Sequence, residues 1–187
     1  MSDAGRRVVL KAGIALGLGW SASSRIVTGQ SDGAAARPEE GDLLVKEGDA
    51  NKTPLTPGDI PAGAGQTMAW AMEPGVRMVR SGSRLNQIML LRLDPGTLTA
   101  DTRARSADGV VAYTSICTHT GCDVDTWMAA EQLISCPCHD SVFDPRDGGR
   151  VVDGPAPRVL PALPLKVVDG KLVVAGPFSA PIGFQKG

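Results

Sequence analysis

Two short stretches decide the fold and the chemistry of this chain: Cys117-Thr118-His119-Thr120-Gly121-Cys122 and Cys136-Pro137-Cys138-His139-Asp140-Ser141. Together they contain all four cysteines and both histidines of the sequence. Thiolate and imidazole groups bind transition metals well, whereas the thioethers of the six methionines are weaker ligands. A chain that gathers every Cys and His into two short stretches is predicted to build a metal centre there.

Each stretch supplies one Cys and one His at close spacing, as Cys117-x-His119 and Cys136-x-x-His139. This pattern resembles the Rieske family, in which two Cys hold one iron of a 2Fe–2S cluster and two His hold the other. The resemblance implies one cluster per chain, with both Cys on the inner iron and both His on the outer iron. In the family the imidazoles lie at the tip of the domain, where an electron partner can touch them.

The resemblance also implies a redox range. Two neutral imidazoles in place of two thiolates make the cluster less negative, which raises its potential into a range of about −150 to +300 mV. Because the second nitrogen of each imidazole can exchange a proton, a proton-coupled one-electron carrier follows.

The remaining two cysteines, Cys122 and Cys138, are not needed as ligands. In family members that have them they form a disulfide between the two loops, and export to an oxidising compartment would let that bond persist. The alternative is a pair of free thiols.

Several further positions are matched to the family one by one. Ser141 matches a serine that donates to a cluster sulfur. Phe143 replaces the usual Tyr of quinol-oxidising members, as in the small subunit of arsenite oxidases; Phe cannot donate to a ligand Cys and is alternatively a packing aromatic. Asp140 replaces the usual Gly, and Asp tolerates a left-handed backbone better than most residues. Thr120 replaces a Leu at the docking face, whereas Gly154-Pro155-Ala156-Pro157 matches the proline-rich loop that covers the cluster.

The composition favours a loop-rich β protein, with 23 Gly, 14 Pro and 4% aromatic residues. A net charge of −1 gives no support for a nucleic-acid partner. Neither a Ser–His–Asp set nor a phosphate-binding Gly loop is evident, so the chain is expected to have no independent catalytic site.

Residues 1–36 are predicted to be a twin-arginine signal segment or, if it is retained, a membrane anchor. Gly5-Arg6-Arg7-Val8-Val9-Leu10-Lys11 resembles the twin-arginine export motif, and the apolar run at residues 12–22 is shorter than a membrane span of roughly 18–20 residues. Ala34-Ala35-Ala36 offers a cleavage site. These features predict a location on the periplasmic side, either soluble or attached to the inner membrane; an untargeted N-terminus is the alternative.

The rest of the chain is expected to be all-β: a Rieske-type antiparallel β sandwich at residues 81–187, with a cluster-binding subdomain at about residues 112–158. Residues 37–80 are predicted to be an extended lead-in or linker. The expected strands are Leu85–Leu93, Gly109–Ile116, Gln132–Ser135, Leu160–Val168 and Lys171–Ala175.

Other metal and partner hypotheses stay open at this point. A zinc site is an alternative use of the same side chains. An oxygenase is disfavoured, because no His remains for a second iron site. By resemblance, the partners are quinol/cytochrome b and a c-type cytochrome, as in a quinol–cytochrome c oxidoreductase. The alternatives are a molybdenum-containing large subunit, as in arsenite oxidase, or none, as in a free-standing periplasmic carrier.

Overall fold

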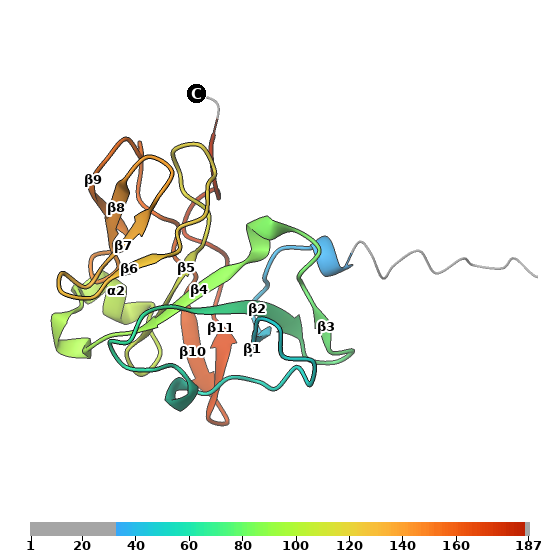
Figure 1. Cartoon of the computed structure of the whole chain (residues 1–187). Helices are drawn as coiled ribbons and strands as arrows, with labels where there is room; N and C mark the ends of the chain where they lie inside the picture. Colours follow the sequence, from blue (N-terminus) through green and yellow to red (C-terminus); the bar gives the residue numbers. More distant parts are fainter. Residues whose placement is uncertain (1–32, 186–187) are drawn as a thin grey trace, which may run out of the picture.

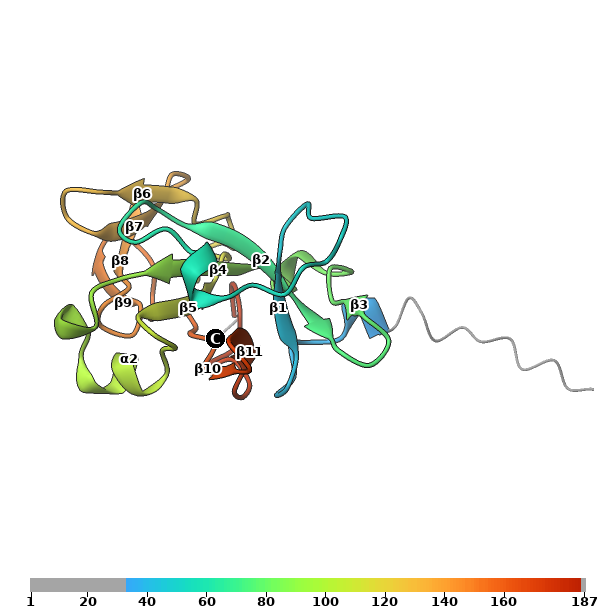
Figure 2. The same ribbon diagram turned by 90° about the horizontal axis from the view of Figure 1, so that it is seen from below.

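A computed structural model describes residues 33–185 (Figure 1). The predicted twin-arginine motif and the apolar run lie outside the described residues. Two antiparallel sheets dominate the described chain, which confirms the all-β prediction. The small sheet lies at one end of the molecule and β3 at the other, as two perpendicular views show (Figures 1 and 2).

The large sheet has the strand order β10-β11-β1-β2-β4-β5, with β3 paired to β2. Its strands are β1 (Leu43–Lys46), β2 (Thr67–Glu73), β3 (Met78–Val79), β4 (Ile88–Arg92), β5 (Val110–Thr114), β10 (Leu165–Val168) and β11 (Lys171–Val174). The small sheet has the order β6-β7-β8-β9. Its strands are β6 (Thr126–Met128), β7 (Leu133–Cys136), β8 (Ser141–Asp144) and β9 (Arg150–Asp153).

The helices are short. α2 (Ala100–Ala104) lies between β4 and β5, and its first turn is capped by the hydroxyl of Thr99, which accepts from the N–H of Thr102. Three 3-10 turns are η1 (Pro57–Asp59), η2 (Arg84–Asn86) and η3 (Pro95–Thr97). Within residues 33–185, none of the helices has the length and apolar character needed to cross a membrane.

Strands β4 and β5 form a wall between two hydrophobic cores. Ile88 and Leu90 belong to the core on one side of this wall, whereas Met89 and Leu91 belong to the core on the other side. Successive side chains of a strand point to opposite faces, so a strand with a core on each face needs apolar residues at every position. The unbroken apolar sequence of β4 therefore reflects burial on both faces.

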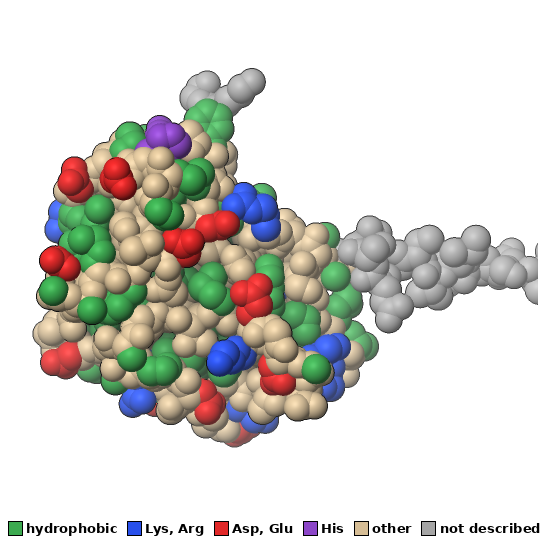
Figure 3. All heavy atoms as spheres, viewed as in Figure 1, with side chains coloured by type: hydrophobic (Ala, Val, Ile, Leu, Met, Phe, Trp, Pro, Cys, Tyr) green, Lys and Arg blue, Asp and Glu red, His purple; other side chains and the backbone are tan. Residues whose placement is uncertain are grey.

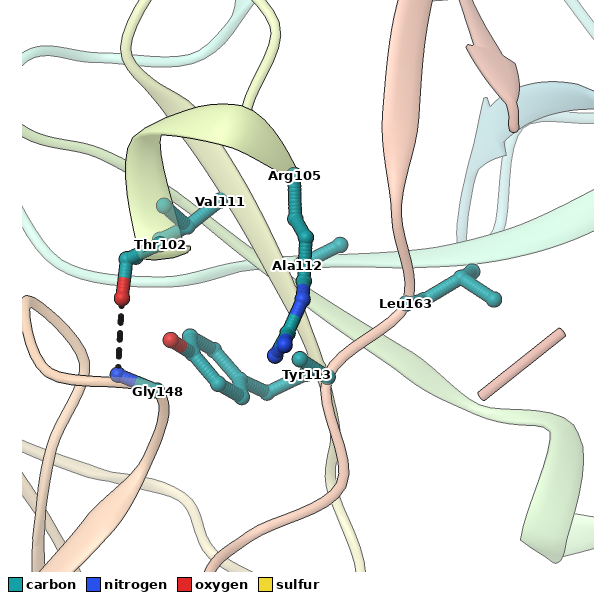
Figure 4. A pocket seen from close by; sticks show the side chains of 8 residues that line it. Thr102, Arg105, Val111, Ala112, Tyr113, Gly148 and Leu163 are labelled. Atoms are coloured by element: carbon teal, nitrogen blue, oxygen red, sulfur yellow. Dashed lines mark hydrogen bonds between the residues drawn. The ribbon is translucent and has the colours of Figure 1, made fainter. Parts of the chain in front are cut away.

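The two sheets are also joined through α2 (Figure 4). The hydroxyl of Thr102 accepts from the N–H of Gly148, in the turn between β8 and β9, at 2.8 Å. On the neighbouring strand β5, the hydroxyl of Tyr113 donates to the carbonyl oxygen of Pro145 at 2.8 Å. Burial raises the pKa of Tyr113, so its hydroxyl keeps the proton that it donates. These contacts fasten the small sheet to the large one.

The prediction of a linker at residues 37–80 was wrong in part. β1 lies inside the large sheet between β11 and β2, and β2 pairs with β4. Of the prolines that suggested a linker, Pro38 precedes β1, and Pro54, Pro57 and Pro61 lie in the connection between β1 and β2. A four-residue strand between such connections has too few alternating positions to stand out in the sequence.

Two predicted strands begin at least three residues later than expected. The segment predicted to start at Leu85 opens with the turn η2, and β4 begins at Ile88. The segment predicted to start at Leu160 becomes a strand only at Leu165. Pro161 and Pro164 precede this strand, and a proline cannot donate an N–H to a sheet ladder.

Asn86 ties the described N-terminal end to the domain. Its side chain is completely buried, and its amide nitrogen donates to the carbonyl oxygens of Ala35, Ala36 and Arg80. Its side-chain oxygen accepts from the guanidinium of Arg37. The predicted cleavage site, Ala34-Ala35-Ala36, is therefore hydrogen-bonded to the folded domain.

We expect Asn86→Ala to lower the free energy of unfolding by about 2–4 kcal/mol, because it leaves several buried polar groups without a partner. Proteolysis near residues 33–37 should accelerate. Asn51→Ala is the matched control, since the Asn51 side chain is exposed and makes no hydrogen bond within the described residues. Equal denaturant midpoints for the two variants would contradict this role of Asn86.

Candidate metal centre

The two predicted ligand stretches come together at one end of the molecule. The first is the loop that follows β5, closed by a bridge between Ile116 and Asp123 and by a 2.8 Å hydrogen bond from the N–H of Cys117 to the oxygen of Cys122. The second is the turn between β7 and β8, where Cys136 pairs with Ser141 across the two strands. Local turns thus hold each stretch, and the sheets bring the two together.

A disulfide joins Cys122 in the first loop to Cys138 in the second, as predicted, with Cα atoms 6.5 Å apart. The sulfurs of Cys122, Cys136 and Cys138 lie within 4.8 Å of one another. Because two of these three sulfurs are bonded to each other, this trio is not a set of three available ligands. The disulfide instead places the second loop against the first.

The other two cysteines, Cys117 and Cys136, are free thiols and are each 1% exposed. They belong to the same hydrophobic core as Phe143. The histidines lie further out, with His119 half-buried and His139 exposed. Figure 3 shows histidine side chains at the surface of this end of the molecule (purple).

The imidazole rings of His119 and His139 lie edge to face, with centroids 4.7 Å apart. Two buried thiols and two more exposed imidazoles therefore converge from two loops. The two thiols are thus the inner pair of this cluster of side chains, and the two imidazoles are the outer pair.

Two buried polar atoms at the site have no hydrogen-bond partner within the described residues: Nδ1 of His119 and Oγ of Ser141. Leaving such an atom unpaired costs about 1–3 kcal/mol, so each is expected to face a group bound at the site. The N–H of His119 also donates to the sulfur of Cys117 at 3.5 Å.

Burial raises the pKa of the Cys136 thiol, and the neighbouring Cys117 sulfur adds to the rise, while the N–H of Cys138 acts in the opposite direction. Without metal, Cys136 thus favours its protonated thiol form. Binding of a metal must displace this proton, because the thiolate is the metal ligand.

Asp140 has a left-handed backbone, with φ of 58°, a conformation that Asp tolerates better than most residues. Gly154 packs directly behind it: a Cβ atom added at Gly154 would lie 2.5 Å from both the oxygen of Asp140 and the Cα of Ser141. Only a glycine lets the segment of residues 154–157 approach so closely. This proline-rich loop also places Ala156 in the core that contains the two free thiols.

The other two positions predicted to tune the cluster differ in burial. Phe143 is completely buried in that core, whereas Thr120 is exposed at the surface of the first loop. The hydroxyl of Thr120 lies 3.7 Å from the sulfur of Cys122.

Three residues that contact the first loop were not predicted as site residues: Arg84, Thr118 and Arg158. Thr118 lies between two predicted ligands and is completely buried, and its hydroxyl donates to the oxygen of Arg158 at 2.7 Å. Arg84 donates to the oxygen of Gly121 and forms an ion pair with Asp123 at 2.6 Å. The position of Thr118 could have suggested its role, but no local pattern connects Arg84 or Arg158 to the first loop.

Comparisons with known proteins bear on the identity of the site. Residues 86–164 match the family model described as "Rieske [2Fe-2S] domain". The chain is also 35% identical over 150 residues to a Streptomyces lividans protein named "Cytochrome bc1 complex Rieske iron-sulfur subunit", covering 77% of this chain and 85% of the relative.

This chain belongs to the Rieske [2Fe-2S] family.

Its cofactor is one 2Fe–2S cluster, which carries electrons. The free thiols, the converging imidazoles and the unpartnered atoms of His119 and Ser141 all fit this group. Family membership therefore favours a 2Fe–2S cluster over the zinc site that the sequence left open.

Relatives of the Rieske chain differ in length and in name. A Streptomyces coelicolor protein with the same name as the S. lividans one is 35% identical over 150 residues, which are 77% of this chain and 41% of the relative. A Haloferax mediterranei protein named "Putative respiratory nitrate reductase subunit Rieske" is 45% identical over 76 residues, covering 40% of this chain and 34% of the relative.

We expect Gly154→Ala to destabilise the Rieske chain and to lower its iron content, because the added methyl group would push the proline-rich loop away from Asp140 and Ser141. Gly170→Ala is the matched control: Gly170 also has a positive φ, but its Cβ would meet nothing within 4 Å. A left-handed backbone alone costs about 1–2 kcal/mol, so the control should lose roughly that stability and keep its iron. Equal losses in both variants would contradict the packing role of Gly154.

Proposed function

We propose that this Rieske chain carries single electrons through a cluster held by Cys117, Cys136, His119 and His139. We assign it as the Rieske subunit of a quinol–cytochrome c oxidoreductase-type complex. The observation that supports the ligand set most directly is that two free, buried thiols and two outer imidazoles meet between disulfide-linked loops.

When bound, the cluster supplies a one-electron acceptor and donor whose potential is raised by imidazole ligation. The thiolates of Cys117 and Cys136 would hold the cluster from the apolar core, where water is excluded. With the cluster bound, the exposed imidazole of His139 would hold or release a proton at its second ring nitrogen and so couple a proton to the electron. The hydroxyl of Ser141, which is buried and has no partner within the described residues, would donate to the bound cluster and so favour its reduced state.

Quinol at cytochrome b is the proposed electron donor, and a c-type cytochrome is the proposed acceptor. The Streptomyces relatives named as bc1 subunits support this assignment. So does the proline-rich loop at residues 154–157, whose residues match those of quinol-oxidising members. The exposed edge of the site at His139 offers the contact through which a quinol hydroxyl would donate its hydrogen bond.

A second partner is favoured by specific observations. Phe143 matches the small subunit of arsenite oxidases, and one relative is named as a subunit of a putative respiratory nitrate reductase. The alternative function is therefore the electron-transfer small subunit of a molybdenum-containing oxidase. A free-standing periplasmic carrier is the third form of the same chemistry.

The proposed location is the periplasmic side of the inner membrane, reached folded by the twin-arginine route. An iron–sulfur protein receives its cluster in the cytoplasm, so export would have to carry the folded domain. The disulfide between Cys122 and Cys138 is consistent with an oxidising compartment.

Isolation of the chain from native membranes and periplasm, with its partners attached, tests the proposed partner. We expect b- and c-type haem to co-purify with it. Molybdenum with a large subunit would favour the alternative function. Iron and sulfide alone, in the periplasmic fraction, would overturn the proposed complex.

We expect Phe143→Tyr to raise the midpoint potential, because a tyrosine hydroxyl could donate to a ligand sulfur and stabilise the reduced state. A net hydrogen bond of about 1 kcal/mol corresponds to an increase on the order of tens of mV. Redox titration of the loaded protein measures this change. Phe178→Tyr, at a partly buried residue packed against the other core, should leave the potential unchanged. An unchanged or lowered potential in Phe143→Tyr would contradict the prediction.

A further inference from the structure

Arg158 connects three segments at the metal centre. It directly follows the proline-rich loop of residues 154–157, and its carbonyl oxygen accepts from the hydroxyl of Thr118 in the first ligand loop. Its guanidinium donates to the carbonyl oxygen of Pro181 at 2.7 Å and to that of Gly183. One residue therefore contacts the first ligand loop, the proline-rich loop and the C-terminal segment (residues 177–185).

The C-terminal segment runs along the chain that leads into the first ligand loop. Figure 1 shows it rising beside that loop towards the end of the molecule that carries the metal centre. Gly183, with a positive φ of 70°, passes over Ile116; a Cβ atom added at Gly183 would lie 3.3 Å from Cγ2 of Ile116. Ile116 is completely buried and immediately precedes Cys117, while Ile182 is 9% exposed.

The far half of this segment depends on Arg158 for its polar contacts. Its first half is fixed at Ser179, whose N–H donates to the oxygen of Ala162 and whose hydroxyl accepts from the N–H of Ala162. Beyond Ser179, within the described chain, the hydrogen bonds to other segments are those that Arg158 makes. Arg158 is half-buried, and hydrogen bonds with a charged donor are stronger than neutral ones.

We propose that Arg158 is a positioning residue that clamps the C-terminal segment onto the first ligand loop, so that this segment forms a third wall of the metal centre. Arg158 itself does not bind metal. It acts through Thr118, which lies between Cys117 and His119, and through the packing of Gly183 on Ile116. The inference rests on the proposed ligand set, because it matters for function only if the first loop holds the cluster.

Amide hydrogen exchange of the loaded protein tests this clamp. In Arg158→Ala we expect the amides of residues 116–121 and of residues 181–185 to exchange about tenfold faster than in the unaltered protein, the factor that corresponds to one net hydrogen bond. Arg158→Lys should lie between the two, since an ammonium group cannot span both carbonyls as a guanidinium does. Arg150→Ala is the matched control, because within residues 33–185 the side chain of Arg150 forms only an exposed ion pair with Asp147 in the same subdomain.

A second variant ends the chain at Ala180, which removes the two carbonyls and leaves Arg158 in place. Its residues 116–121 should also exchange faster, and both variants should lose visible cluster absorbance sooner in the presence of an iron chelator. If Arg158→Ala fails to fold, the shortened chain and Arg158→Lys carry the test. Unchanged exchange at residues 116–121, with changes confined to residues 181–185, would overturn the clamp.

Failure of the Arg158 clamp can be distinguished from failure of the proposed electron-transfer function. Exchange is measured on the isolated chain with no electron partner present, so a wrong partner assignment leaves the result intact. A chain that binds no iron would sink the proposed function, whereas the exchange of its metal-free form would still report whether Arg158 holds the two segments together.

Discussion

The metal centre depends on holding two loops in fixed register although they come from different sheets. The first loop leaves β5 of the large sheet, and the second is the β7–β8 turn of the small sheet. The disulfide between Cys122 and Cys138 joins them directly. A crosslink of this kind, closing a loop of about 15 residues, is worth about 3 kcal/mol in the chain-entropy description. Movement of one loop relative to the other would separate Cys117 and His119 in the first loop from Cys136 and His139 in the second.

Strands β4 and β5 and the contacts between the two sheets fix the positions from which the two loops leave. Because β4 and β5 have a core on each face, the strand that delivers the first loop is fixed by packing on both sides. The contacts of Thr102 and Tyr113 fasten the small sheet, with its β7–β8 turn, to the same wall. The thiols of Cys117 and Cys136 face the core between the sheets, and this leaves the imidazoles for the outer side, where an electron partner can approach.

The parts that the sequence predicted are those with a local cause. The ligand spacing and the disulfide pairing by family resemblance each depend on a few adjacent residues or on a specific motif. The strands β1 and β2 were missed, because their place in the sheet depends on pairing with β11 and β4, far away in the sequence. The clamp at Arg158 was missed for the same reason: nothing near Arg158 indicates that the C-terminal segment folds back beside Cys117.

We propose that Cys117, Cys136, His119 and His139 hold the 2Fe–2S cluster of this chain. The most direct test is pulsed electron paramagnetic resonance of the reduced protein with nitrogen-15 in its histidines, together with iron and sulfide analysis. The account predicts two irons and two sulfides per chain, with strong coupling to two histidine nitrogens, one of which disappears in His139→Ser. An iron–sulfur signal without histidine coupling, or a single zinc in place of iron, would contradict it.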